Sequence, residues 1–239
     1  MAKYPVFADL VVFEDEHVLM LNKPSGMASL NERNSDVLTL IDLIKKENPD
    51  YQLCHRLDKE TSGILIVAKD PETYRSIAMA FEHRQVKKYY HAVVSGQLKV
   101  DHQSIVLPIA LLKNGTSRIN VKEGKPAETI ITTIDQFRHF TLVECQPITG
   151  RQHQIRVHLA AQNFPIVCDT TYGGKIPFLS HLKRDFKTSK WENEQGMMQR
   201  VALHARAISF EVNGMEYKGE APYPKDFAVL LKLLDKNDR

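Results

Sequence analysis

The sequence from residue 55 to residue 69 reads HRLDKETSGILIVAK, and it joins a charged turn to an apolar strand. Five of its first nine residues are ionisable, whereas residues 64–68 are all apolar. A short, continuous apolar run is typical of a strand that is buried on both faces. A carboxylate at the entrance to such a strand meets a low local dielectric, in which its pKa and hydrogen bonding can be tuned. Asp58 is therefore a candidate functional residue, although a solvated turn around Thr61 and Ser62 has a similar composition.

Hairpins and further strands alternate with helices along the rest of the chain. Apolar residues 10–13 and 18–21 predict one antiparallel pair. Asn213-Gly214 is a typical hairpin turn between residues 201–212 and 215–219. Further strands are predicted at 88–95, 127–134 and 139–146, and helices at 36–47 (capped by Ser35 or Asp36), 71–81, 152–162 and 225–236. Strands outnumber helices, which indicates an α+β fold with a mixed, largely antiparallel central sheet flanked by helices and loops.

The helix that follows the apolar strand has the clearest local signals. Asp70 is a favourable N-cap residue, and Pro71 stands in the first helical position. Four apolar or aromatic residues follow at helical spacing, and we expect them to face the core: Tyr74, Ile77, Ala78 and Phe81.

Composition limits the class of protein. The 239 residues carry 32 Lys plus Arg and 29 Asp plus Glu, a formal net charge of +3, which permits a polyanionic partner without requiring one. No apolar run approaches the roughly 18–20 residues that span a bilayer, so we expect no membrane-embedded segment. The N-terminal sequence has acidic residues where a signal peptide would have its apolar core. The three cysteines are too far apart in sequence to indicate a disulfide scaffold. The expected location is a reducing cytoplasm.

Metal and hydrolase chemistry are poorly supported by the spacing of the residues they need. His153 and His158 would diverge by about 140° on a helix, so they do not form a two-ligand pair. The sequence has no HExxH or CxxC motif, and Ser62 lies outside a GxSxG turn. Cys54 beside His55 is better explained as a buried structural thiol than as a nucleophile. We therefore expect no metal.

Three motifs resemble those of a known family. HRLDKETSGILIVAK resembles the signature of the RluA family of RNA pseudouridine synthases, and KKYYHAVVSG at 87–96 and PITGRQHQIRVHLA at 147–160 resemble that family's second and third motifs. Shorter matches occur in the family's order at 124–129, 203–205 and 221–227. The resemblance covers roughly Phe13 to Phe227, and it implies the pseudouridine synthase fold, with a catalytic cleft across the sheet.

Two departures from the family pattern affect domain organisation. Many relatives carry a separate N-terminal RNA-binding module, and a signature that begins at residue 55 leaves no room for one in this sequence. We therefore expect residues 1–239 to form a single, stand-alone catalytic domain. Residues 173–200 match no family motif; they are polar and aperiodic, which predicts a long surface excursion.

The resemblance implies catalytic roles for three residues. Asp58 is the family's catalytic carboxylate, which either attacks the nucleotide or abstracts a sugar proton. Tyr90 would stack on the uracil and assist proton transfer, whereas Tyr89 is expected to pack in the core. Arg156 would pair with Asp58 and keep it ionised, because an adjacent positive charge lowers a carboxylate pKa by roughly 1–3 units. The isomerisation needs no redox change and no second substrate, so no cofactor is expected.

Further residues are candidates for RNA binding. Arg56 would occupy the space that the flipped base leaves, and His55 precedes it in the signature. Lys87 and Lys88 stand beside Tyr90, where they would form a phosphate-binding rim. The expected helix over 152–162 places Thr149 or Gly150 at its N-terminus and Arg151 in its first turn, where exposed N–H groups and the macrodipole favour an anion.

These residues predict RNA as the partner, ribosomal RNA, a transfer RNA stem-loop or both. We expect the protein to act as a monomer and not to bind a membrane. A non-catalytic RNA-binding or ribosome-assembly factor on the same fold is the main alternative. An enzyme that acts on free nucleotides is a weaker one. The presence of Asp58, Tyr90 and Arg156 together favours the RNA-modifying enzyme, because simple binding needs no carboxylate facing a polyanion.

Overall fold

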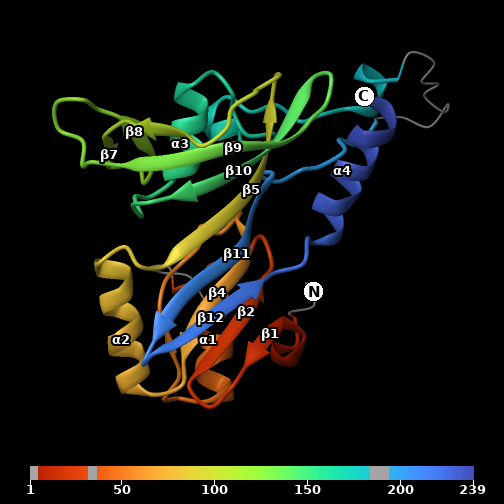
Figure 1. Ribbon diagram of the computed structural model, residues 1–239. Coiled ribbons are helices and arrows are strands. Elements are labelled where there is room, and N and C mark those ends of the chain that lie inside the picture. The colour runs from red at the N-terminus through yellow and green to blue at the C-terminus, as the bar shows by residue number, and fades with distance from the viewer. Residues whose placement is uncertain (1–4, 32–36, 184–193) are drawn as a thin grey trace. The chain divides into compact units, whose positions relative to one another are not determined.

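The computed structural model describes residues 5–31, 37–183 and 194–239 (Figure 1). The predicted caps Ser35 and Asp36 lie outside these residues, as does part of the predicted excursion over 173–200. The chain divides into two compact units. Unit 1 comprises Met1–Tyr89 and His204–Pro222, and unit 2 comprises Tyr90–Leu203 and Tyr223–Arg239.

Unit 1 is built on a sheet of mostly antiparallel strands. Its strands pair in the order β1 (Val11–Glu14), β2 (Val18–Lys23), β4 (Ser62–Ala68) and β11 (Leu203–Val212), with β3 (Gln52–Leu53) on β4 and β12 (Met215–Glu220) on β11. Only β4 and β11 are parallel among these pairs, as far as the described residues go. The helical elements are η1 (Phe7–Leu10), α1 (Leu40–Glu47) and α2 (Pro71–Glu82). Both predicted hairpins are confirmed.

The apolar run forms β4, and every residue of this strand is buried. β2 pairs with one edge of β4, and β11 pairs with the other near the start of the strand. Gly63 permits the parallel approach to β11, because a Cβ atom at this position would lie 2.2 Å from the carbonyl oxygen of Ala205. The charged turn therefore leads directly into the centre of the unit.

The caps of the two helices in unit 1 explain their start points. Asp70 accepts a hydrogen bond from the backbone N–H of Thr73 at 2.8 Å, so α2 begins as predicted. The most buried side chains of α2 are, however, Thr73, Ile77 and Ala80, whereas the other three predicted core residues are half-buried. Thr73, Ile77 and Ala80 stand at i, i+4 and i+7, so they share one face of the helix.

The helix predicted at 36–47 begins later, at Leu40. Asp42 accepts hydrogen bonds from the backbone N–H and the hydroxyl of Thr39 at 2.9 and 2.8 Å, which caps α1 at that residue. Val37 consequently precedes the helix and is exposed. Periodicity alone placed this start too early because the cap depends on a side-chain contact.

Unit 2 contains a ladder of four antiparallel strands and two α-helices. Its strands pair in the order β5 (Lys87–Ser95), β10 (Phe140–Pro147), β9 (Glu128–Gln136) and β6 (Gln103–Val106), and β7 (Ile109–Leu111) pairs with β8 (Ser117–Ile119) in a separate hairpin. The helical elements are α3 (Gln154–Ala161), η2 (Thr170–Tyr172), η3 (Leu179–His181) and α4 (Lys225–Asn237). Apolar side chains of the four-stranded sheet, α3 and α4 form one core. The mixed, largely antiparallel α+β fold is thus confirmed.

Two expectations about unit 2 need correction. The helix predicted at 152–162 begins at Gln154, because His153 adopts a left-handed backbone conformation with φ of 55° and serves as its N-cap. The segment predicted as a surface excursion also contributes to the core, since Met198 is buried.

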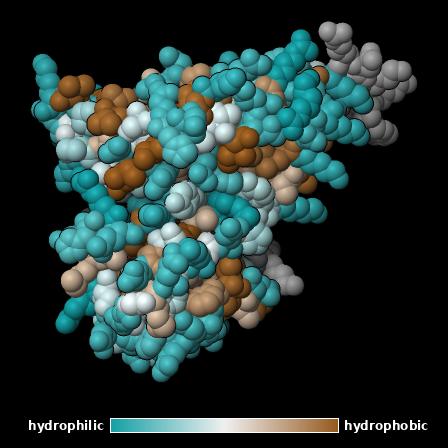
Figure 2. Space-filling view, viewed as in Figure 1, coloured by the Kyte–Doolittle hydropathy of each residue, from teal (hydrophilic) through white to brown (hydrophobic). Residues whose placement is uncertain are grey.

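The face of the molecule shown in Figure 2 is mostly hydrophilic. Hydrophobic residues occur in small groups among hydrophilic ones on the face in Figure 2. In the described part of the chain, no helix is long and apolar enough to cross a membrane.

Candidate active site

Asp58 lies in the loop that leads into β4, and the main chain on both sides of it is fixed. The carbonyl of Asp58 accepts from the N–H of Thr61 at 3.0 Å, and the carbonyl of Lys59 accepts from the N–H of Gly26 at 2.8 Å. Ser29 Oγ donates to the carbonyl of Leu57 at 2.8 Å and accepts from its N–H at 3.0 Å. The carboxylate is half-buried at the entrance to the strand, as the sequence predicts.

Lys23 is the centre of this support and was missed by the sequence analysis. Its side chain is wholly buried, and Nζ donates to the carbonyls of Met27, Pro24 and Lys59 at 2.7, 3.0 and 3.2 Å. A buried ammonium is stabilised when it donates to several acceptors, here three main-chain dipoles. Ser25 adds a further bond from its hydroxyl to the carbonyl of Glu60. The only sequence feature that pointed to Lys23 is its position in a Lys-Pro turn directly after the apolar strand at 18–21.

His55 has a structural role. Its Nε2 accepts from the N–H of Ile66 at 3.1 Å, and its ring lies 4.9 Å from that of Phe81. Burial lowers the pKa of His55 to about 3, and the positive charge of Lys88 adds to the effect. The neutral ring therefore ties the loop to β4, and a direct contact with RNA stays a prediction.

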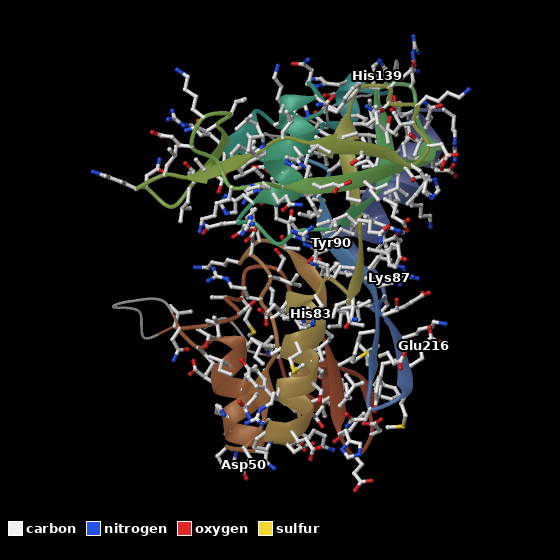
Figure 3. All side chains as sticks on the ribbon, turned by 60° about the vertical axis from the view of Figure 1, so that its left-hand side comes forward. Asp50, His83, Lys87, Tyr90, His139 and Glu216 are labelled. Atoms are coloured by element: carbon white, nitrogen blue, oxygen red, sulfur yellow. The ribbon has the colours of Figure 1, made fainter. Side chains whose placement is uncertain are left out.

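The basic candidate residues of unit 1 differ in exposure. Lys88 lies over the ring of Phe81, with Nζ 5.8 Å from the centroid, and burial lowers its pKa. Arg56 and Lys87 are exposed to solvent. Figure 3 shows Lys87 and Tyr90 on β5. Lys87 and Arg56 are thus better placed for a solvent-side phosphate than Lys88.

Tyr90 is half-buried at the edge of the core of unit 2. Ala92 and Val94 share its strand face and are fully buried, so the face runs from the edge of the core to its interior. The ring of Tyr90 packs against this core, and its stacking on a base stays a prediction.

Arg156 lies on α3 and is 6% exposed. Its Nε and Nη2 donate to Oδ2 and Oδ1 of Asp169 at 2.7 and 2.8 Å, and its guanidinium lies 5.0 Å from the ring centroid of Tyr172. The sequence analysis did not predict Asp169, which directly follows Cys168. A buried arginine requires a carboxylate, so Asp169 was the first candidate after an acid-free stretch.

A buried polar network anchors α3, the helix that carries Arg156, to neighbouring segments of unit 2. Gln154 Nε2 donates to the carbonyl of Glu128 and to Thr129 Oγ1, at 2.8 and 2.9 Å. His158 bridges Thr129 Oγ1 and the carbonyl of Leu107, each at 2.9 Å, and burial lowers its pKa. His158 is thus a neutral structural group. Within the described ranges, no cluster of three or more His, Cys, Asp or Glu is arranged to hold a metal ion.

The predicted position of Arg151 is wrong. Because α3 begins at Gln154, Arg151 and Thr149 precede the helix instead of forming its first turn. The side-chain oxygen of Gln154 accepts from the N–H of Arg151 and the hydroxyl of Thr149, at 3.0 and 2.7 Å. The N–H of Arg151 is thus bonded within the chain, and Arg151 is not in the first turn of the helix, so the anion-binding argument no longer supports Arg151.

The candidate residues fall in both units. Asp58 belongs to unit 1, whereas Tyr90 and Arg156 belong to unit 2. The pairing of Arg156 with Asp58 stays a prediction.

Comparisons with known proteins identify the class. The model of the RNA pseudouridylate synthase family matches residues 17–161. The chain is 34% identical to the ribosomal large subunit pseudouridine synthase C of Salmonella typhi, over 98% of this chain and 72% of that protein. It is 35% identical to the protein of the same name from Escherichia coli strain K12, over 88% of this chain and 64% of that protein. The solved structure of human RNA pseudouridylate synthase domain containing 4 shares the fold, with a TM-score of 0.73 at 23% identity, covering 96% of this chain and 94% of that one.

The fold and the three motifs thus define an RNA-modifying isomerase. The chain belongs to the RNA pseudouridylate synthase family. The predicted resemblance is confirmed, and the activity class is that of an RNA pseudouridine synthase.

Proposed function

We propose that the chain converts specific uridines of large-subunit ribosomal RNA to pseudouridine, with Asp58 as the catalytic carboxylate. The observation that carries the proposal is the signature at 55–69, which folds as a rigidly held loop entering a buried strand. The relatives named ribosomal large subunit pseudouridine synthase C favour ribosomal over transfer RNA as the substrate. The chain spans 72% and 64% of these two relatives.

The chemistry is an isomerisation within one nucleotide. The bond between C1′ and N1 breaks, the base turns, and a bond forms between C1′ and C5 while the hydrogen of C5 leaves as a proton and N1 gains one. Atoms and electrons balance without a redox partner, so the residues of this chain suffice. The uridine must leave its stack, because a side chain does not reach the reacting atoms inside a helix.

The other site residues act around Asp58 in this proposal. Arg156 pairs with the carboxylate of Asp58 and orients it, and Tyr90 stacks on the uracil. Arg56 fills the space that the base leaves, and its exposure supports this role. Lys87 supplies a positive charge for the RNA backbone. Asp58 acts either as a nucleophile or as a base toward a sugar proton.

We also propose that both units form one catalytic domain over residues 1–239, acting as a monomer in the cytoplasm. The family match over 17–161 runs through both units, which supports a single functional domain.

Mapping of pseudouridines across cellular RNA, with and without the protein, tests the proposed function. We expect one or a few uridines of large-subunit ribosomal RNA to lose modification and to regain it with the wild-type chain but not with Asp58→Asn. Loss only in transfer RNA would overturn the ribosomal assignment. Restoration of every site by Asp58→Asn would favour a non-catalytic RNA-binding factor.

A further inference from the structure

Arg156 is held by two residues of one short segment, 168–174. Asp169 binds two nitrogens on one edge of the guanidinium, at 2.7 and 2.8 Å, and Tyr172 places its ring over the group at 5.0 Å. Asp169 is 1% exposed, so the ion pair is almost fully removed from water. A bidentate pair fixes both the plane and the rotation of a guanidinium, which a single bond does not.

The segment that supplies Asp169 is itself tightly closed. The carbonyl of Asp169 accepts from the N–H groups of Tyr172 and Gly174 at 3.0 and 2.8 Å, and its own N–H donates to the carbonyl of Ile166 at 3.0 Å. A Cβ atom on Gly174 would lie 1.9 Å from the carbonyl oxygen of Ile166. The turn therefore requires glycine at position 174, and its main-chain bonds fix the backbone of Asp169.

Tyr172 is also fixed at its far end. Its hydroxyl accepts from the N–H of Ser117 at 2.9 Å and contacts Nδ1 of His153 at 2.8 Å. Ser117 belongs to β8, and His153 caps α3. The ring plane is thus set by two elements, and a cation over a rigid, desolvated aromatic face is favourable.

We propose that Asp169 and Tyr172 are positioning residues that orient the guanidinium of Arg156 for the isomerisation. This inference rests on the proposed function, in which Arg156 acts beside Asp58. Asp169→Asn removes the negative charge and places an amide NH2 opposite the guanidinium of Arg156, which is itself a donor, so the bidentate pair is lost. Glutamate keeps the charge with one more methylene.

A purely structural ion pair is the competing explanation, and a matched control separates the two. Arg200 and Asp226 form a second bidentate pair in unit 2, with distances of 2.7 and 2.9 Å. Asp226→Asn removes the same charge from a bidentate pair whose carboxylate is 44% exposed, so the rates of the two variants are compared together with their Tm values. A loss of stability alone would affect both variants in proportion to their change in Tm.

The experiment measures pseudouridine formation in a large-subunit ribosomal RNA transcript under single-turnover conditions, together with the Kd for that RNA and the Tm. For Asp169→Asn we expect a rate constant about 100-fold lower with the Kd within about 3-fold of wild type. Asp169→Glu should recover at least about 10-fold of this loss, and Asp226→Asn should keep the wild-type rate within about 3-fold.

Tyr172 provides a second route if Asp169→Asn does not fold. Tyr172→Leu removes the ring and should lower the rate constant about 10-fold, whereas Tyr172→Phe keeps the ring, loses only its bonds to Ser117 and His153, and should lower the rate constant about 3-fold. A wild-type rate in Asp169→Asn, or equal losses in Tyr172→Leu and Tyr172→Phe, overturns the inference and leaves the proposed function standing. A wild-type chain that forms no pseudouridine overturns both.

Discussion

The loop of Asp58 in unit 1 and the helix of Arg156 in unit 2 hold their functional groups in opposite ways. Asp58 is positioned through its main chain, by bonds that Lys23 and Ser29 make to the carbonyls of its neighbours. Arg156 is positioned through its side chain, by a carboxylate 13 residues further along. The main-chain bonds fix the position of the backbone that carries Asp58. The bidentate pair fixes the orientation of the Arg156 guanidinium.

The two regions also stabilise buried cations differently. Three carbonyl dipoles surround the ammonium of Lys23, whereas a full negative charge faces Arg156. The ion pair with Asp169 offsets the positive charge of the Arg156 guanidinium. Loss of either partner leaves a buried polar group unsatisfied, which is the costly case in both regions.

The largest expected effect concerns the loop of unit 1. Asp58→Asn should lower the single-turnover rate on the order of 10⁴-fold or more, as when a nucleophile or base is removed. Because the main-chain bonds remain, Tm and RNA affinity should change little. Exposed Asp50→Asn is the control for the loss of one negative charge, and it should retain the wild-type rate (Figure 3). Comparable rates for the two variants would contradict the assigned role.

Lys23→Met tests whether main-chain support matters. The substitution keeps the volume but leaves three carbonyls without their donor, so we expect the free energy of unfolding to fall by about 3 kcal/mol. Lys45→Met is matched, since its Nζ donates to the carbonyl of Pro49 at an exposed position. It should cost less than about 0.5 kcal/mol in the same denaturant titration. Equal losses of unfolding free energy in the two variants would mean that the buried bonds of Lys23 stabilise the fold no more than one exposed bond.

Gln154→Leu tests the corresponding support in unit 2. It removes the side chain that bonds Glu128, Thr129, Thr149 and Arg151, and we expect unfolding to become easier by about 2 kcal/mol. Gln152→Leu removes one exposed bond to the carbonyl of Gly115 and serves as the control. Chemical denaturation should separate the two. Similar stabilities would show that the network beneath α3 is dispensable.

The fold and the site were predictable to different degrees. β4 and the hairpins follow from short-range periodicity and turn residues, which act locally. The starts of α1 and α3 did not, because Thr39 and His153 act as caps through contacts and a backbone conformation that periodicity does not contain.

Support for the site was the least predictable part. Lys23 follows an apolar strand at a turn, where a lysine is usually solvated, and only the convergence of two loops buries it. Asp169 lies in a different segment from the helix that carries Arg156, and the only sequence signal for their contact is that Asp169 is the first acidic residue after an acid-free stretch.

A pH dependence of stability is also predicted for unit 1. The pKa of His55 falls from 6.5 to about 3 on folding, so below about pH 6.5 only the unfolded state gains this proton. The free energy of unfolding should therefore decrease on acidification by up to about 1.4 kcal/mol per pH unit. His55→Gln should flatten this slope between pH 6 and about pH 4, whereas the exposed His102→Gln should not. Parallel slopes for all three proteins would contradict the role of His55.

The most direct test of the account is release of tritium from a large-subunit ribosomal RNA transcript labelled at C5 of uridine. The purified chain is incubated with this RNA in the presence of a chelator and without added cofactor. Isomerisation expels the C5 hydrogen, so we predict tritium release that matches the pseudouridine formed, with no change in the length of the RNA. Binding of the RNA without tritium release would contradict the central claim that this chain is an RNA pseudouridine synthase acting through its own residues.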